Sequence, residues 1–178
     1  EAANDLVPVI REVKPQVLVT YDQYGNYGHP DHIQAHRVAT YALALAAAPS
    51  YRIDLGPAWD VAKVYWTALP KAAVKKGIDA FVAAGGQGFF GLAEGEDLPW
   101  ALDDELVTTC VTALDQEPHK MAALRAHLTQ VGTENDFFRL SELVGPEAMG
   151  IEYFRLVRGR LGPTGPDGLE DDLFAGLT

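Results

Sequence analysis

The sequence predicts an α/β fold in which a mostly parallel sheet is flanked by helices. Short runs of β-forming residues alternate along the chain with longer segments of helical apolar periodicity. Near the N-terminus a strand, a glycine-containing loop and a helix follow one another directly, which is half of a βαβ unit. The length of 178 residues, with 48% hydrophobic and 22% charged residues, is typical of a single soluble globular domain.

The first predicted element is an amphipathic helix, because Leu6, Val9, Ile10 and Val13 recur at helical spacing. Pro15 lies just beyond this stripe and would end the helix. Proline removes a backbone donor, so Pro8 fits such a helix only in its first turn or at a kink.

A buried strand is predicted next, over residues 16–21, where β-forming residues lie between helix breakers. The loop 22–30 carries the turn residues Gly25, Asn26 and Gly28, and a helix is expected to run from Asp31 to about Ala48. In α/β folds ligands bind outside the carboxyl ends of the strands, so this loop lies where a binding site is expected.

The rest of the chain continues the alternation of strands and helices. Further strands are predicted over 62–69, 107–114 and 151–157, helices over 71–83 and 117–130, and turn-rich loops over 85–105 and 162–168. The helix 117–130 has its apolar stripe in Met121, Leu124 and Leu128.

Charge and cysteine content exclude several classes of protein. A net charge of −11 argues against a nucleic-acid or anionic-membrane binder, since both need a basic patch. No apolar run is long enough to cross a bilayer, which takes about 20 residues. Cys110 is the only cysteine and is expected to be a buried, inert thiol. The absence of any possible intrachain disulfide fits a reducing compartment, and a cytoplasmic location is predicted.

Three histidines cluster after the first strand: His29, His32 and His36. Residues three or four apart on a helix are neighbours, so either His29 with His32 or His32 with His36 could reach one metal ion. Asp22 and Asp31 lie among them and could orient an imidazole through its second nitrogen. Exposed helix histidines usually bind nothing, and the spacing by itself leaves both interpretations open.

The segment 19–22 (VTYD) followed by 27–32 (YGHPDH) resembles the second signature of the LmbE-like (PIG-L) zinc N-deacetylases, most closely those of the mycothiol pathway that deacetylate an N-acetylglucosaminyl-inositol. Segments 63–67 (KVYWT), 123–130 (ALRAHLTQ) and 172–177 (DLFAGL) also resemble this family. The resemblance implies a Rossmann-like sheet, a cytoplasmic amide hydrolase and a small amino-sugar inositol as substrate.

The resemblance also implies roles for individual residues. His32 would be a ligand of zinc, or of iron in its place. His29 would act as the general acid, Asp31 would orient and tune His29, and Tyr27 would lie over the site and polarise the amide carbonyl. Gln130 would contact the sugar. His36 has no role in the family pattern and is interpreted as structural.

The family's first signature, A-H-P-D-D, which supplies the other metal ligands and the general base, does not occur in this sequence. Residues 1–178 are therefore expected to be the C-terminal portion of one such domain, lacking its first β-α units and leaving an exposed sheet edge or apolar face. A missing N-terminal segment or a companion chain would supply the remaining ligands. The alternatives are a mycothiol S-conjugate amidase and a non-catalytic sugar-binding module.

Several other polar and aromatic residues have simpler interpretations. The three tryptophans are expected to pack in the core or in loops and not to form a sugar platform, and His119 is expected on the surface. The acidic groups 94–97 and 103–105 are expected in solvated loops.

Overall fold

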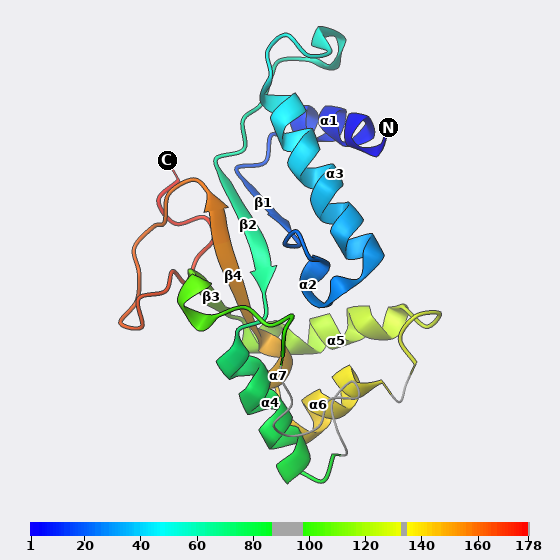
Figure 1. The fold of residues 1–178 in the computed structure, drawn as a ribbon, viewed down its shortest axis with the longest axis vertical. Coiled ribbons are helices and arrows are strands. Elements are labelled where there is room, and N and C mark those ends of the chain that lie inside the picture. Colours follow the sequence, from blue (N-terminus) through cyan, green and yellow to red (C-terminus); the bar gives the residue numbers. More distant parts are fainter. Residues whose placement is uncertain (87–97, 133–134, 178) are drawn as a thin grey trace.

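A computed structural model describes residues 1–86, 98–132 and 135–177 of the chain (Figure 1). The α-helices are α1 (Ala2–Val13), α2 (Gly25–Gly28), α3 (Pro30–Ala47), α4 (Lys71–Ala83), α5 (Glu117–Ala126), α6 (Asp136–Val144) and α7 (Glu147–Gly150). The strands are β1 (Val17–Thr20), β2 (Lys63–Ala68), β3 (Thr109–Thr112) and β4 (Ile151–Arg158). Short 3₁₀ turns lie at Ile53–Leu55, Asp104–Leu106 and Leu114–Gln116.

The strands form one sheet in the order β1-β2-β4-β3, which confirms the α/β class. The sheet is mixed, however, and the expectation of a mostly parallel sheet is wrong for the described strands. β1 and β2 are parallel, whereas β4 runs antiparallel to both of its neighbours, β2 and β3. The chain reaches β4 from the helices α5, α6 and α7, which lie beyond the carboxyl ends of β1 and β2 in Figure 1. An antiparallel return from that end needs no crossover over the sheet face.

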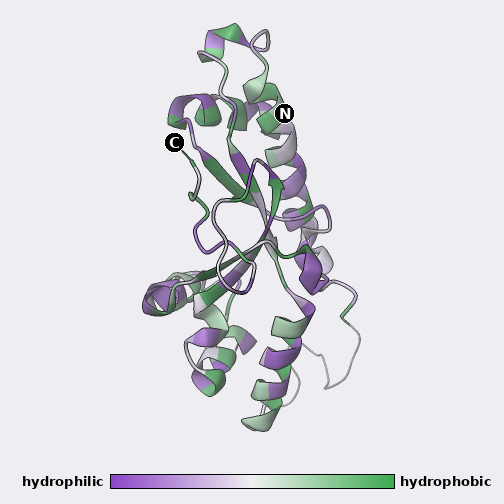
Figure 2. Ribbon diagram, turned by 90° about the vertical axis from the view of Figure 1, so that its left-hand side faces the viewer, coloured by the Kyte–Doolittle hydropathy of each residue, from purple (hydrophilic) through white to green (hydrophobic). Residues whose placement is uncertain are grey.

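Helices α1 and α3 pack together and cover one face of β1 and β2. Val7, Ile10, Ala42, Ala46 and Val64 form the centre of this core, and each is at most 4% exposed. Figure 2 shows hydrophobic residues on the central strands and mixed hydrophobic and polar residues along the helices. A helix with one apolar stripe is stable when that stripe is buried in this way.

The buried face of α1 agrees with the predicted stripe only in part: Ile10 is buried and Leu6 packs against the core. Val7 is fully buried, whereas Val9 and Val13 are 49% and 67% exposed. The helix also accommodates Pro8 in its interior. The sequence indicated the period of the helix correctly, but the buried side extends toward Val7 and not toward Val9 and Val13.

The predicted helix 117–130 ends earlier than expected, at Ala126. His127 leaves the helical conformation, and its Nδ1 lies 2.8 Å from the carbonyl oxygen of Ala123. Leu128, which was expected in the apolar stripe, lies in the following turn and is 74% exposed. Helices α2, α6 and α7 were not predicted. Two of them, α2 and α7, are only four residues long and contain glycine.

The C-terminal tail, residues 159–177, lies against the sheet on the other side from α3. Its Glu170 pairs with β3 through backbone hydrogen bonds to Thr108 and Cys110. The side chain of Glu170 reaches further, to Lys63 and Tyr65 of β2. Tail residues, and not a helix, therefore cover this part of the sheet.

Cys110 in β3 is a free, half-buried thiol. Burial raises the pKa of this thiol, which fits the expectation that it is unreactive, since the thiolate is the reactive form.

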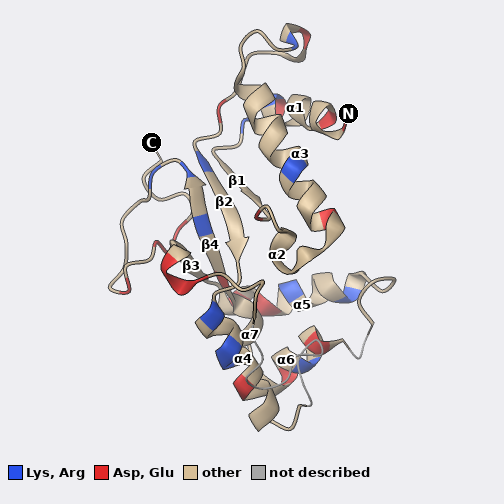
Figure 3. Ribbon diagram, in the orientation of Figure 1, with Lys and Arg blue, Asp and Glu red and all other residues tan. Residues whose placement is uncertain are grey.

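Figure 3 shows charged residues spread over helices, strands and loops, and the buried charged side chains among the described residues are Arg11, Lys63 and Glu170. The acidic residues 103–105 are exposed as expected, but two of them have specific partners on α4. Asp103 pairs with Lys71 at 2.7 Å, and Asp104 accepts a hydrogen bond from the Ala72 amide in the first turn of that helix. A carboxylate at a helix N-terminus interacts favourably with the helix dipole. The other acidic group, residues 94–97, lies outside the described residues.

No helix in the described part of the chain is both long and apolar enough to cross a membrane.

Candidate active site

The loop after β1 is held in shape by Asp22. Its Oδ1 accepts hydrogen bonds from the backbone amides of Tyr24 and Asn26, at 3.0 and 2.9 Å. An aspartate that binds backbone amides two and four residues on stabilises a tight turn. Asp22 therefore shapes the loop. Its carboxylate binds backbone amides and not an imidazole, unlike the orienting role that the sequence suggested.

Gly25 allows this loop to approach the first turn of α3 closely. Its φ is +66°, and a Cβ added there would lie 2.7 Å from the Ile33 nitrogen and 2.9 Å from the Cβ of His32. Both the positive φ and the lack of space require glycine. The loop is thereby seated directly against the helix turn that carries His32.

Helix α3 begins with a histidine cap. His29 is the N-cap residue, Pro30 occupies the first helical position, and the His29 Nδ1 accepts a hydrogen bond of 3.2 Å from the Asp31 amide. The acceptor role of Nδ1 assigns the proton of the neutral ring to Nε2. Asp31 thus contacts His29 through its backbone. In the described residues no hydrogen bond joins the Asp31 carboxylate to an imidazole.

Four aromatic rings gather at this point. His32 stacks on Tyr21 with ring centroids 4.0 Å apart and an interplanar angle of 3°. His29 lies 4.8 Å from His32, and Tyr27 meets His32 edge-on at 5.2 Å and His29 at 6.2 Å. The structure therefore brings together His29, His32 and Tyr27, three residues to which the resemblance gives roles. Tyr21 is a further member that was not predicted as a site residue, although its position at the end of the strand could have indicated it.

His32 carries an unusual atom. Its Nδ1 is buried and has no hydrogen-bond partner among the described residues. Buried polar atoms are nearly always paired, so an orphaned imidazole nitrogen needs an explanation. Such a nitrogen is a suitable donor to a divalent metal ion. In the part of the chain that the structure describes, no three or more His, Cys, Asp or Glu side chains group closely enough to hold a metal.

His36 lies outside this cluster. Its Nδ1 is 2.9 Å from the carbonyl oxygen of Tyr21, and its ring meets Trp66 edge-on at 5.2 Å. His36 thus links α3 to the ends of β1 and β2, in line with a structural role. Of the two histidine pairs that the spacing allowed, the rings that come together are those of His29 and His32.

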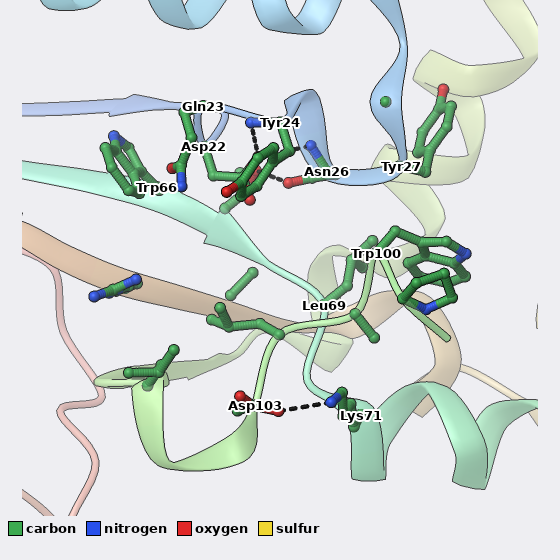
Figure 4. A pocket seen from close by; sticks show the side chains of 18 residues that line it. Asp22, Gln23, Tyr24, Asn26, Tyr27, Trp66, Leu69, Lys71, Trp100 and Asp103 are labelled. Carbon is green, nitrogen blue, oxygen red and sulfur yellow. Dashed lines mark hydrogen bonds and ion pairs between the residues drawn. The ribbon is translucent and has the colours of Figure 1, made fainter. Parts of the chain in front are cut away.

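A pocket of about 640 Å³ lies beside the histidines, between the loop after β1 and the segment that precedes β3 (Figure 4). Its lining residues are 22–24 and 26–28 of the loop, 66–69 and Lys71 around the end of β2, 99–103, Leu106, and Arg155 of β4. Tyr27 lines the pocket and also contacts His29 and His32, whereas the two histidines themselves are not part of the lining.

Two of the three tryptophans line this pocket, contrary to the expectation that all three serve only packing. In Figure 4 Trp66 lies at one end of the pocket, and Trp100 lies near Tyr27 at the other end. Trp59 packs as expected: it contacts the core, and its indole nitrogen donates to the Pro15 carbonyl at 2.8 Å. The sequence could not separate them because pocket exposure depends on distant segments.

Gln130 and His119 are both exposed. Gln130 lies in the turn after α5, where its backbone amide donates to the His127 carbonyl, and it is not among the pocket-lining residues. His119 contacts Gln116 near the start of α5, which agrees with its predicted surface position.

Comparison with known proteins gives the chain its relatives. Residues 1–43 match the PIG-L family, described as GlcNAc-PI de-N-acetylase. The chain is 55% identical over 179 residues to a protein of a Nocardioides species named 1D-myo-inositol 2-acetamido-2-deoxy-alpha-D-glucopyranoside deacetylase. Proteins of the same name from Geodermatophilus obscurus and Kribbella flavida are each 53% identical to it, over 178 and 181 residues.

Each of these alignments covers 99% of the chain but only part of the relative. The chain spans 59%, 60% and 58% of the lengths of the three relatives, respectively.

Proposed function

Because the chain is related to the PIG-L N-deacetylases, we propose that it forms the C-terminal portion of a metal-dependent enzyme that removes the acetyl group from an N-acetylglucosaminyl-inositol in mycothiol biosynthesis. The observation that carries this proposal is the ring cluster of His29, His32 and Tyr27 at the carboxyl end of β1, together with the unpaired, buried Nδ1 of His32. The names of the relatives support the choice of substrate. A cytoplasmic location accompanies the proposal.

His32 is the metal ligand contributed by this chain, with zinc or iron as the ion. When bound, such an ion polarises the amide carbonyl and lowers the pKa of the attacking water, to about 7 for zinc. A catalytic zinc usually takes about three protein ligands. The other ligands would come from an N-terminal segment of the full-length protein or from a companion chain.

His29 is the general acid. Amide hydrolysis requires a proton on the leaving nitrogen, and a positioned acid typically accelerates such a step by about 10²–10⁴-fold. His29 acts in its imidazolium form and gives up the proton on Nε2, the nitrogen that does not contact the Asp31 amide; loss of that proton leaves a neutral imidazole. Asp31 orients the ring through this backbone contact.

Tyr27 lies between the histidines and the pocket, and its hydroxyl donates to the developing oxyanion of the amide. A donor aimed at that charge typically contributes about 10²–10³-fold. Tyr27 is 56% exposed, which leaves it free to contact a substrate. Gln130, exposed after α5, is the proposed contact for the sugar.

The test compares His29→Ala and His32→Ala in the full-length, metal-loaded protein. His32→Ala should lose bound metal, measured by elemental analysis, and with it the release of acetate from N-acetylglucosaminyl-inositol. His29→Ala should retain metal but lose at least about 10²-fold in kcat, the lower range for a general acid. His119→Ala is the matched control, because His119 is an exposed histidine away from the ring cluster.

Three results would overturn parts of the proposal. Unchanged metal content in His32→Ala would remove it as a ligand, and normal kcat in His29→Ala would remove it as the acid. A wild-type protein that prefers a thiol-conjugated mycothiol amide over the N-acetyl sugar would be a conjugate amidase. A full-length protein that binds the sugar but never hydrolyses it would be a binding module.

A further inference from the structure

The end of the pocket around Trp66 is built from directly opposed residues of two strands. Trp66 of β2 and Arg155 of β4 are cross-strand partners, so their side chains project from the same face of the sheet. The Arg155 guanidinium carbon lies 6.0 Å from the centroid of the Trp66 ring. Both residues line the pocket.

The Trp66 ring has a second neighbour on α3. His36 meets it edge-on at 5.2 Å, and His36 itself contacts the Tyr21 carbonyl at 2.9 Å. The indole therefore presents a fixed ring surface to the pocket. A rigid aromatic surface binds a ligand with little loss of conformational entropy.

Arg155 has unused donors. Among the described residues its guanidinium has no hydrogen bond or ion pair, in contrast to Lys71, whose ammonium pairs with Asp103 across the same pocket. Arginine presents five N–H donors in a planar fork that can bind two acceptors at once. The guanidinium is thus available to a ligand in the pocket.

The surroundings suit a neutral polyol. The charged residues that line the pocket balance, since Asp22 and Asp103 are matched by Lys71 and Arg155, and the chain as a whole carries a net charge of −11. A ring with adjacent hydroxyls can accept from the arginine fork, donate to a carboxylate and place its C–H face on an indole. Pockets of roughly 300–1,000 Å³ with a few polar groups and aromatic walls are typical small-molecule sites.

We propose that the Trp66–Arg155 end of the pocket binds the inositol ring of the substrate, a step that rests on the function proposed above. Tyr27 and Trp100 lie at the opposite end of the pocket in Figure 4, and Tyr27 contacts both histidines. A two-ring substrate lying along the pocket places its acetamido sugar at Tyr27 and its inositol ring on Trp66, beside Arg155. Arg155 is then a specificity-determining residue that selects for inositol.

The experiment uses the full-length, metal-loaded protein and two substrates, N-acetylglucosaminyl-inositol and the methyl α-glycoside of N-acetylglucosamine. Arg155→Gln should raise KM for the inositol substrate by about tenfold or more, the effect of losing a charge-assisted hydrogen bond, with little change in kcat. It should leave kcat/KM for the methyl glycoside unchanged. Arg155→Lys, which keeps the charge but loses the fork, should lie between wild type and Arg155→Gln.

The matched control is Arg158→Gln. Arg158 lies on the same strand but pairs with Asp60 on the surface and does not line the pocket, so both substrates should be turned over as by wild type. Equal loss on both substrates by Arg155→Gln, or no loss on either, would overturn the inference.

Failure of the proposed function would be visible separately, as a wild-type protein that hydrolyses neither substrate. In that case the binding of free myo-inositol, measured by saturation-transfer NMR on wild type and Arg155→Gln, decides the inference. Binding that Arg155→Gln abolishes supports the site, and no binding, or equal binding by both proteins, overturns it.

Discussion

At the scale of single residues, the candidate site depends on how closely one loop approaches one helix. The Tyr21–His32 ring stack requires the loop after β1 to fold back tightly, and Gly25 makes this possible. Two glycines of the loop, Gly25 and Gly28, both have positive φ, but only Gly25 is crowded by α3. Comparing them separates the effect of backbone strain from that of close packing.

Gly25→Ala should therefore cost more stability than Gly28→Ala. The positive φ by itself costs alanine about 1–2 kcal/mol at either position. At Gly25 the added methyl also meets the Ile33 nitrogen at 2.7 Å, and overpacking of this kind adds about 1–3 kcal/mol. Urea unfolding of the two variants of the full-length protein measures the difference. Equal losses would mean that the loop can move away from α3 freely.

At the scale of elements, one side chain binds each end of helix α3. His29 caps its N-terminus, and Arg11 of α1 binds its C-terminal end. Arg11 is only 3% exposed and donates to the carbonyl oxygens of Leu45, Ala46 and Ala48, and beyond the helix to those of Arg52 and Gly56. Helix C-termini leave unpaired carbonyls and a partial negative charge, and a buried guanidinium satisfies both.

Arg11→Lys should destabilise the protein although it keeps the charge. A lysine has three donors on one atom and cannot reach five carbonyls spread around a planar fork, and each carbonyl left buried without a partner costs about 1–3 kcal/mol. We expect a loss of about 2–4 kcal/mol in the free energy of unfolding. Arg37→Lys, on the exposed side of α3, is the control and should change stability by less than about 0.5 kcal/mol. Similar values for both variants would show that Arg11 does not support the helix end.

At the scale of the whole molecule, one buried ionic network joins the C-terminal tail to the middle of the sheet. The Glu170 carboxylate accepts hydrogen bonds from Lys63 at 2.5 Å, Tyr65 at 2.5 Å, Thr109 at 3.1 Å and the Gly162 amide at 2.8 Å. The side chains of Lys63 and Glu170 are 2% and 0% exposed. Removing one partner of a buried pair is costly because the other charge is left unpaired.

The network also makes stability depend on pH. Burial by itself would raise the pKa of Glu170, but the hydrogen bonds from Lys63 and Tyr65 outweigh it and hold that pKa below the ordinary 4.5. The unfolded chain then takes up the proton at a higher pH than the folded chain. The stabilisation is therefore complete above about pH 4.5 and is lost as the pH falls through the lower, folded pKa.

Glu170→Gln should lower the free energy of unfolding at pH 7 by about 3–5 kcal/mol, the usual effect of breaking a buried pair. The difference from wild type should shrink as the pH falls below about 4.5, since wild type then loses the same charge. Chemical unfolding of both proteins at several pH values measures this. Asp79→Asn, in an exposed pair with Lys75, is the control and should cost at most about 1 kcal/mol. A difference that does not vary with pH would show that the charge of Glu170 contributes nothing.

Local patterns in the sequence determined much of this protein. The strand at residues 16–21, the loop with its glycines and the helix that starts beside His29 follow from turn chemistry and apolar periodicity, which act over a few residues. The cluster of His29, His32 and Tyr27 follows from the same segment, since all three lie within six residues of one another. The resemblance of this segment to the N-deacetylases is likewise local.

The tertiary structure decided whatever depends on residues far apart in the chain. Segments far apart in the chain set the direction of β4 and the buried face of α1. Distant segments also meet in the pairing of Trp66 with Arg155 and in the hydrogen bond from Lys63 to Glu170. Periodicity shows that a helix or strand has an apolar side but not which neighbour covers it, because that choice is made by packing of the whole chain. For this reason the closeness of His29 and His32 could be expected from the sequence, whereas the pocket beside them and the arginine within that pocket could not.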